Sequence, residues 1–321
     1  MRKLAILGAG IFGDRREREL FEPAGYQADY YECDDPLDLA DSLTDVEGLI
    51  VNLEQVTDAL LDRLPGLKAI GRYGVGVDNI DLEAASRRRI PVINVPDYCI
   101  DEVAEHAVSF IFAVNRKLPT ATSLPRKGDW GKVQALKPIR AIKETTLGVV
   151  GTGRIGMKVI EMMAPFGCKI LICDPYLAHA KLPSNAEITG FDELLALSDI
   201  ITIHCPLTEQ TRRMFCTDTF TRMLKQPAII NVSRGPIIDE RDLLAALDEG
   251  VVSFAALDVM ESEPPDKDHP LLQHPKAIVT GHAAWYSEQS ENRLRDLLAM
   301  RIMDCLEGRP VPSIVNKFSN E

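Results

Sequence analysis

The stretch Thr146-Leu-Gly-Val-Val-Gly-Thr-Gly-Arg-Ile-Gly156 joins a short apolar run to a glycine-rich turn. Residues 157–166 follow it with apolar side chains at the spacing of a helix. A second apolar run, residues 169–173, ends directly before Asp174. Strand, glycine turn, helix, strand and acid, with the acid about twenty residues beyond the turn, is the pattern of a dinucleotide-binding unit.

The glycines and the acid each have a physical role in this pattern. Gly151, Gly153 and Gly156 let the backbone turn tightly and approach a pyrophosphate, whose charge lies at the helix N-terminus. Asp174 would accept hydrogen bonds from both ribose hydroxyls of an adenosine and would repel a 2′-phosphate. The motif therefore predicts NAD as the cofactor.

A second glycine turn, Gly8-Ala-Gly-Ile-Phe-Gly13, also follows an apolar run. The charged run Asp14-Arg-Arg-Glu-Arg-Glu19 comes next, where a helix packed closely against a strand and a dinucleotide would be more apolar. The following candidate strand, residues 27–32, is polar and ends in no clean acid. Because a bare glycine pattern is a weak signal, we interpret this turn as the βα turn of another domain.

Length and composition limit the classes of protein. The 321 residues suit two domains, each large enough for its own core. A hydrophobic content of 45% and a charged content of 26% are typical of a soluble globular protein. The net charge of -12 argues against a nucleic-acid partner, which would need clustered Lys and Arg. No apolar segment approaches membrane-spanning length, so no membrane partner is expected.

The cysteines and histidines predict neither disulfides nor a metal site. The 7 cysteines are odd in number and form no C-x-x-C motif, which indicates reduced thiols in a cytoplasmic protein. The N-terminal segment has no signal-peptide core. His269 and His274 lie in a proline-rich loop without further ligands, so no metal is expected.

Strands alternate with helices along the chain, which predicts an α/β fold with parallel sheets covered on both faces. The expected strands are residues 3–7, 48–51, 69–72, 92–94, 146–150, 169–173, 200–204, 228–232, 254–257 and 277–280. The expected helices are residues 15–22, 56–63, 81–88, 101–117 and 288–307. Pro119 follows the end of the fourth helix, and residues 125–138 are expected to form an irregular surface loop.

Three short motifs near the C-terminus carry an arginine, a glutamate and a histidine. They are Asn231-Val-Ser-Arg-Gly235, Asp258-Val-Met-Glu-Ser-Glu-Pro-Pro265 and Gly281-His-Ala-Ala-Trp285. The guanidinium of Arg234 would grip a carboxylate with two parallel hydrogen bonds. A histidine such as His282 exchanges a proton near neutral pH, and a carboxylate such as Glu263 can orient it. Taken singly, each of the three is more simply interpreted as an ordinary residue: a surface arginine, a surface glutamate and a hydrogen-bonded histidine.

Further motifs occur in one order along the chain. They are Arg72-Tyr-Gly-Val-Gly-Val-Asp-Asn-Ile-Asp81, Asn94-Val-Pro96, Val103-Ala-Glu-His-Ala107, His204-Cys-Pro-Leu-Thr208 and Ala256-Leu-Asp258. With the glycine turn and the three motifs above, they resemble the D-isomer-specific 2-hydroxy acid dehydrogenases over nearly the whole chain. Within that family, His282-Ala-Ala-Trp-Tyr-Ser-Glu288 resembles the C-terminal-binding proteins, which are NADH-linked transcriptional corepressors, and their bacterial relatives.

The resemblance implies two doubly wound parallel-sheet domains. A flavodoxin-like substrate domain would comprise residues 1–97 with 286–321, and a Rossmann NAD-binding domain, residues 98–285, would be inserted between its parts. The active site is expected in the cleft between the domains, where closure excludes water. Because the family commonly forms dimers through its dinucleotide domain, a homodimer is expected.

The resemblance also implies roles for the polar residues. His282 would give a proton to the substrate carbonyl oxygen during reduction, and Glu263 would hold its imidazole. Arg234 would bind the substrate carboxylate and carbonyl oxygen. The loop formed by Arg72, Tyr73, Gly74, Val75 and Gly76 would supply backbone amides to the same carboxylate, with added charge from Arg72.

On the cofactor side, the resemblance assigns Arg154 and Ile155 to the pyrophosphate turn and Asp258 to the nicotinamide carboxamide. Cys205, Pro206 and Val232 would line the path to the nicotinamide. For Cys205 and Val232, packing at a strand end is an alternative interpretation.

Two classes of function remain open from the sequence, and the complete catalytic set favours the first. One is an enzyme that interconverts a small 2-keto acid and a D-2-hydroxy acid with NAD. The other is an NADH-responsive module that binds protein partners. Trp285 is expected to line the substrate pocket and contact an apolar side chain, or else to pack at a domain hinge against the last helix.

Overall fold

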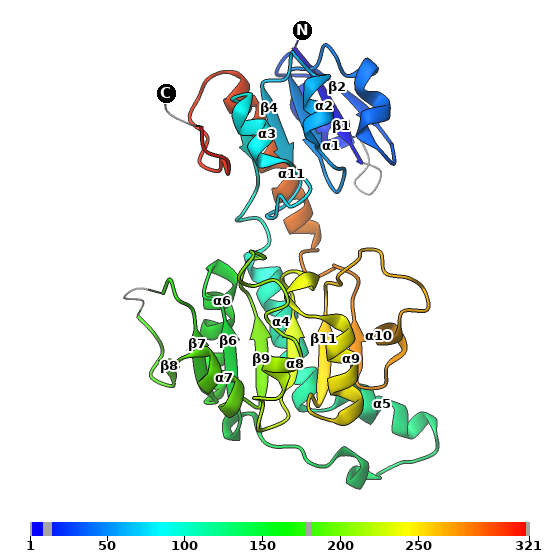
Figure 1. Cartoon of the computed structure of the whole chain (residues 1–321), viewed down its shortest axis with the longest axis vertical. Coiled ribbons are helices and arrows are strands. Elements are labelled where there is room, and N and C mark those ends of the chain that lie inside the picture. The colour runs from blue at the N-terminus through cyan, green and yellow to red at the C-terminus, as the bar shows by residue number, and fades with distance from the viewer. Residues whose placement is uncertain (1, 9–14, 178–180, 319–321) are drawn as a thin grey trace. The chain divides into compact units, whose positions relative to one another are not determined.

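The computed structural model describes residues 2–8, 15–177 and 181–318 (Figure 1). The chain divides into two compact units, Met1–Cys99 with Ser287–Glu321, and Ile100–Tyr286. Each unit contains one parallel sheet, so the predicted fold class of two α/β parallel-sheet domains is confirmed. The N-terminal glycine turn expected from Gly8 to Gly13 lies, beyond Gly8 itself, outside the described residues.

Within the described residues, the first unit contains a five-stranded sheet in the order β2-β1-β3-β4-β5, with every neighbouring pair parallel. Its strands are β1 (Arg2–Leu7), β2 (Tyr26–Tyr31), β3 (Gly48–Val51), β4 (Ala69–Arg72) and β5 (Val92–Ile93). Its helices are α1 (Arg15–Phe21), α2 (Asp58–Asp62), α3 (Leu82–Arg87), α11 (Glu288–Leu306) and the 3₁₀ helix η2 (Pro36–Ser42). This strand order is that of a flavodoxin-like sheet.

Helix α11 completes this unit from the far end of the sequence and packs against α1 and β4. Gly71 leaves room for it, since a Cβ at that position would lie 2.9 Å from Ile302. Arg295 of α11 donates to both carboxylate oxygens of Glu17, at 2.7 and 2.5 Å, and these side chains are 6% and 1% exposed. A buried charge needs such a partner, so α1 and α11 are tied by this pair.

The described part of the second unit contains a seven-stranded sheet in the order β12-β11-β10-β9-β6-β7-β8, again parallel throughout. Its strands are β6 (Thr146–Val150), β7 (Lys169–Cys173), β8 (Ala186–Ile188), β9 (Ile200–Ile203), β10 (Ala228–Asn231), β11 (Phe254–Leu257) and β12 (Ala277–Val279). The first strand, β6, lies inside the sheet, with β7 on one side and β9 on the other. This is the Rossmann order with one added strand, and the order reverses between β6 and β9.

Helices cover both faces of this sheet (Figure 1). They are α4 (Ile100–Asn115), α5 (Leu118–Arg126), α6 (Arg154–Met163), α7 (Phe191–Leu197), α8 (Thr217–Phe220), α9 (Glu240–Glu249) and α10 (Pro270–Gln273). Helix α4 packs against α6 and against β9, β10 and β11. Buried side chains of α7, α8, α9 and α10 form one apolar cluster with the sheet, among them Leu194, Phe220, Leu247 and Leu271.

Most of the predicted strands end within one residue of the observed bounds, and the main difference follows α4. The sequence predicted no helix directly after Lys117, yet α5 begins at Leu118 with Pro119 in its first turn. Proline is tolerated there because the first amides of a helix have no partner within it. The expected irregular loop over residues 125–138 contains the end of α5 and the 3₁₀ turn η3 (Val133–Leu136).

Candidate active site

The glycine turn follows β6, at the point where the strand order reverses. Gly151 has φ +92°, and a Cβ there would lie 2.6 Å from the amide nitrogen of Cys205. A Cβ at Gly156 would overlap the carbonyl oxygen of Gly151, whereas no atom lies within 4 Å of the corresponding point on Gly153. The turn is therefore tightly packed on the protein side and open beside Gly153, as the approach of a pyrophosphate requires.

Helix α6 begins at Arg154, and its N-cap residue, Gly153, has no side chain that could cap the helix. Arg154 is exposed and Ile155 is half-buried at this first turn. A helix N-terminus without a capping side chain attracts anions through its amides and its dipole. The residues present fit the pyrophosphate of a dinucleotide.

Asp174 lies at the carboxyl end of β7 beside the glycine turn. Its Oδ2 accepts hydrogen bonds from the amide and the hydroxyl of Thr152, both at 2.6 Å, and its Oδ1 accepts from the Tyr176 amide at 2.8 Å. Burial raises the pKa of Asp174, but these hydrogen bonds outweigh it and bring the pKa below its usual value. A carboxylate offers about four acceptor positions, so capacity remains for a ribose hydroxyl. The sequence interpretation missed Thr152, although a hydroxyl residue inside the turn was the available signal.

Side chains at the ends of β9 and β10 lie on the same carboxyl edge of the sheet. Cys205 and Val232 are buried, and Pro206 is exposed. Burial raises the pKa of the Cys205 thiol to about 11 and lowers that of the neighbouring His204 to about 3. Both side chains are therefore uncharged at neutral pH and bring no charge to this edge of the sheet.

His282 and Glu263 are hydrogen-bonded to each other. Nδ1 of His282 lies 2.6 Å from Oε2 of Glu263, while Oε1 of Glu263 accepts from the Met260 amide at 2.9 Å. Burial raises the pKa of Glu263, but the hydrogen bond and charge of His282, the Met260 amide and the charge of Arg234 together lower it below its usual value. Glu263 is thus an ionised partner for the imidazole.

Arg234 lies on the loop that follows β10, next to the loop that carries Glu263. The backbone makes this approach at Gly235, where a Cβ would overlap the carbonyl group of Met260. Asn231 holds the turn, since its side-chain amide donates to the Arg234 carbonyl at 2.9 Å. The structure therefore brings Arg234, Glu263 and His282 together, although their motifs are far apart in the sequence.

Trp285 is half-buried three residues after His282. Its ring meets that of Tyr286 edge to face, with the centroids 5.5 Å apart. Tyr286 is itself exposed. Both the pocket and the hinge interpretations of Trp285 agree with this environment.

The loop from Arg72 to Gly76 follows β4 in the first unit. The amides of Tyr73 and Gly74 already donate to the carbonyls of Val51 and Arg72, both at 2.9 Å. The Tyr73 hydroxyl is also used, because it donates to Glu17 at 3.0 Å in the core.

Tyr73 and Gly74 therefore shape the loop rather than offer donors. The side-chain amide of Asn94 donates to the Val75 carbonyl at 2.6 Å and fixes the tip of the loop. The amides of Val75 and Gly76 donate to no acceptor among the described residues.

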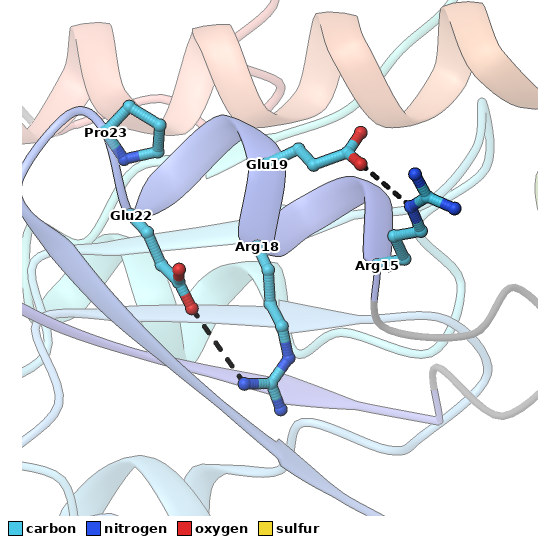
Figure 2. A pocket seen from close by; sticks show the side chains of 5 residues that line it. All are labelled: Arg15, Arg18, Glu19, Glu22 and Pro23. Atoms are coloured by element: carbon cyan, nitrogen blue, oxygen red, sulfur yellow. Dashed lines mark hydrogen bonds and ion pairs between the residues drawn. The ribbon is translucent and has the colours of Figure 1, made fainter.

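A hollow on α1 is lined by Arg15, Arg18, Glu19, Glu22 and Pro23 (Figure 2). Arg15 lies 2.9 Å from Glu19, and Arg18 lies 3.9 Å from Glu22, each pair one helical turn apart. In exposed ion pairs of this kind the two charges cancel, and the pairs contribute little to the free energy of unfolding. No residue predicted for the active site lines this hollow.

The parallel sheet and its glycine turn define a dinucleotide-binding α/β protein. The arginine, glutamate and histidine lie together in the same unit. A family model described as "D-isomer specific 2-hydroxyacid dehydrogenase, NAD binding domain" matches residues 108–284. The chain is 35% identical over 286 residues to the glyoxylate reductase of Thermofilum pendens, covering 87% of this chain and 84% of that protein. The chain therefore belongs to the D-isomer-specific 2-hydroxyacid dehydrogenase family.

Other relatives agree with this assignment. The D-3-phosphoglycerate dehydrogenase of Methanocaldococcus jannaschii is 37% identical over 282 residues, which cover 87% of this chain but only 53% of that enzyme. The chain thus spans about half the length of that relative. D-lactate dehydrogenase from Aquifex aeolicus, solved with NAD and lactic acid, matches with a TM-score of 0.87 at 27% identity, covering 95% of this chain and 96% of that one.

Across residues 2–8, 15–177 and 181–318, no three His, Cys, Asp or Glu side chains converge as a metal site would require. In the described part of the chain, no helix combines the length and the apolar character needed to cross a membrane.

Proposed function

We propose that the protein is an NAD-dependent D-2-hydroxyacid dehydrogenase that interconverts a small 2-keto acid and the corresponding D-2-hydroxy acid. The observation that carries the proposal is the 2.6 Å contact between His282 and Glu263 beside Arg234. These groups lie at the carboxyl ends of strands in the unit that carries the glycine turn, where open α/β sheets bind ligands. The corepressor alternative gains no support from the relatives named above.

Glu263 fixes which nitrogen of His282 takes part in proton transfer. Because its ionised carboxylate can only accept, Nδ1 of His282 donates to Oε2 of Glu263. Nε2 is then the nitrogen that gives a proton to the substrate carbonyl oxygen during reduction and removes it from the hydroxyl during oxidation. The carboxylate also stabilises the imidazolium form that the reductive direction requires.

Arg234 and the tip of the β4 loop supply the anion-binding groups of the proposal. The guanidinium of Arg234 binds the substrate carboxylate and carbonyl oxygen. The amides of Val75 and Gly76 are the donors that this proposal assigns to a substrate carboxylate, because the other two amides of that loop are already used.

The cofactor in this proposal is NAD, held through its pyrophosphate at Gly151–Gly156 with Arg154 and Ile155, and through its ribose at Asp174. When bound, its nicotinamide supplies or accepts the hydride. Cys205, Pro206 and Val232 line its path, and Asp258 contacts its carboxamide. The remaining acceptor capacity of Asp258 limits that contact, since its carboxylate already accepts three hydrogen bonds.

We assign Trp285 to the wall of the substrate pocket. Its half-buried ring favours a 2-keto acid with an apolar or thioether side chain and disfavours 3-phosphohydroxypyruvate. The test is a turnover assay with NADH and a panel of 2-keto acids that includes glyoxylate, pyruvate, aliphatic and thioether acids and 3-phosphohydroxypyruvate. Turnover of an apolar member supports the proposal, and no NADH oxidation with any member overturns it.

We further propose a cytoplasmic homodimer. All seven cysteines are described and are free thiols, in keeping with a reducing compartment. The segment 118–136 has no buried residue, and it exposes Leu118, Val133 and, at 85%, Trp130. Exposed apolar side chains within one short segment indicate a surface that binds a protein partner. We propose that this partner is a second copy of the chain. Light scattering on the native protein and on Val133→Asp tests this, with a monomer expected only for the variant.

A further inference from the structure

Asp258 is buried at the carboxyl end of β11 and is surrounded by donors from the segment that carries His282. The carboxylate is 2% exposed. Its Oδ1 accepts from the Thr280 hydroxyl at 2.5 Å and from the Ala283 amide at 2.9 Å, and its Oδ2 accepts from the Ala284 amide at 3.0 Å. The His282 amide donates to the Asp258 carbonyl at 2.5 Å.

These bonds hold an unusual backbone conformation. His282 has φ +56°, in the left-handed region that residues with a side chain rarely adopt. Such a conformation persists where the surrounding bonds determine it. Here the residue itself and the two that follow each donate an amide hydrogen bond to Asp258. Asp258 therefore fixes the direction in which the imidazole of His282 leaves the backbone.

A histidine from α4 extends this set of contacts. Nε2 of His106 lies 3.0 Å from the Thr280 hydroxyl and 3.8 Å from Oδ1 of Asp258. Thr280 has a single hydroxyl proton, which it gives to the carboxylate, so the hydroxyl oxygen must accept from His106. Nε2 of His106 therefore carries a hydrogen and is the donor in this contact. Its ring is held edge-on against Phe110, with the centroids 4.6 Å apart.

We propose that His106 and Thr280 are positioning residues, which orient the Asp258 carboxylate and through it hold His282 in its left-handed conformation. Without the Thr280 hydroxyl, Oδ1 of Asp258 loses its shortest donor and the carboxylate can rotate away from the two amides. The inference rests on the proposed function only for the consequence in catalysis. The effect on the backbone of residues 281–286 is independent of any substrate.

The pair Thr280→Val and Thr280→Ser separates the hydroxyl from the shape of the side chain. In hydrogen exchange of the cofactor-free protein, Thr280→Val should speed the exchange of the 281–286 segment by about tenfold, because one strong hydrogen bond is lost. Thr280→Ser keeps the hydroxyl and should exchange like the wild type. Unchanged exchange in Thr280→Val, or equal acceleration in both variants, overturns the proposal.

Kinetics give the second readout. Thr280→Val should lower kcat for the best 2-keto acid on the order of tenfold, since small misplacement of a reacting group is costly, with a smaller loss of NADH affinity through Asp258. A loss confined to NADH affinity would mean that His106, Thr280 and Asp258 act on cofactor binding, and it overturns the proposal. If no acid in the panel is turned over, the proposed function fails while the exchange experiment still decides the present inference.

His106 is tested in the same way. His106→Gln can place an amide near the position of Nε2 and should retain most of the exchange protection, whereas His106→Leu fills similar volume without a donor and should lose it. Equal protection in both variants would show that His106 is not a positioning residue for Asp258.

Discussion

Gly235 and Met260 touch through their backbones, so closely that a Cβ on Gly235 would overlap the Met260 carbonyl group. This contact joins the loop that follows β10 to the loop that follows β11. Arg234 precedes the contact on one loop, and Glu263 follows it on the other. The separation between the guanidinium and the carboxylate therefore depends on a residue without a side chain.

Gly235→Ala should separate the two loops. The added methyl group meets backbone rather than the end of a flexible side chain, so relief requires movement of one loop. We expect kcat/KM for the keto acid to fall on the order of a hundredfold and the free energy of unfolding to drop by about 1–3 kcal/mol. Gly190→Ala, at the N-cap of α7, is the control, because its φ is -72° and a Cβ there would meet no atom within 4 Å. Unchanged activity in Gly235→Ala would show that the loop spacing is irrelevant.

Glu263→Gln should shift the pH dependence of reduction. The reductive direction needs a protonated imidazole, and removing the neighbouring negative charge disfavours that form. The alkaline limb of the pH–rate profile should therefore move to lower pH. Because the pKa of Glu263 lies below its usual value, the wild-type carboxylate stays ionised across the neutral range, and the acid limb should be unaffected. An unchanged profile would contradict the pairing.

His282→Ala should abolish proton transfer while leaving the cofactor site intact. We expect turnover to fall on the order of a hundredfold or more, because a positioned acid–base group contributes about that much. The glycine turn and Asp174 belong to other loops, so NADH should bind with nearly the wild-type Kd. Fluorescence titration and steady-state kinetics on the same preparation measure both quantities. Parallel loss of NADH binding would assign His282 to the cofactor instead.

Asp174→Ala should weaken NADH and favour NADPH relative to it. The substitution removes an acceptor for the ribose and the charge that would repel a 2′-phosphate. A loss of on the order of tenfold in NADH affinity is expected for a charged hydrogen bond. Since Asp174 also accepts from Thr152, the Thr152→Val variant controls for simple loosening of the turn. Wild-type protein that already binds NADPH as tightly as NADH would disprove the role of Asp174.

Trp285→Ala should discriminate between substrates. If the indole contacts the substrate side chain, KM should rise more for an apolar keto acid than for glyoxylate, which has no side chain. The expected difference is about tenfold, as for partial loss of one apolar contact. Equal losses for both acids, with a lower Tm, would instead show that Trp285 packs within the protein.

The central strands of both sheets were predictable because they are buried on both faces. Continuous apolar runs such as 146–150 and 254–257 are typical of strands buried on both faces, and their observed bounds equal the predicted ones. The short edge strand β8 lacks such a run, since Glu187 and Ile188 are exposed, and it escaped prediction. Helix α5 was missed because Pro119 signals a helix stop and a helix start equally well.

The active site likewise contains features that the sequence predicts and features that it does not. Gly151, Gly153 and Gly156 stand in one continuous motif with its own local mechanics, so their geometry could be read from the sequence. The contact between His106 and Thr280 joins residues 174 positions apart, and no local pattern distinguishes this histidine from a solvated one. Tyr73 shows the same limit, since only its contact with Glu17 reveals that its hydroxyl is buried in the core.

The late position of α11 in the sequence has a consequence for synthesis on the ribosome. Ile302 and Leu298 cover Gly71, and Arg295 neutralises Glu17, yet all three follow the whole second unit along the chain. A nascent chain therefore completes the continuous unit while the first sheet still presents an apolar face and a carboxylate that lacks its arginine partner. That half-built sheet is the species that chaperones would recognise, and it persists until residues up to Leu306 have emerged.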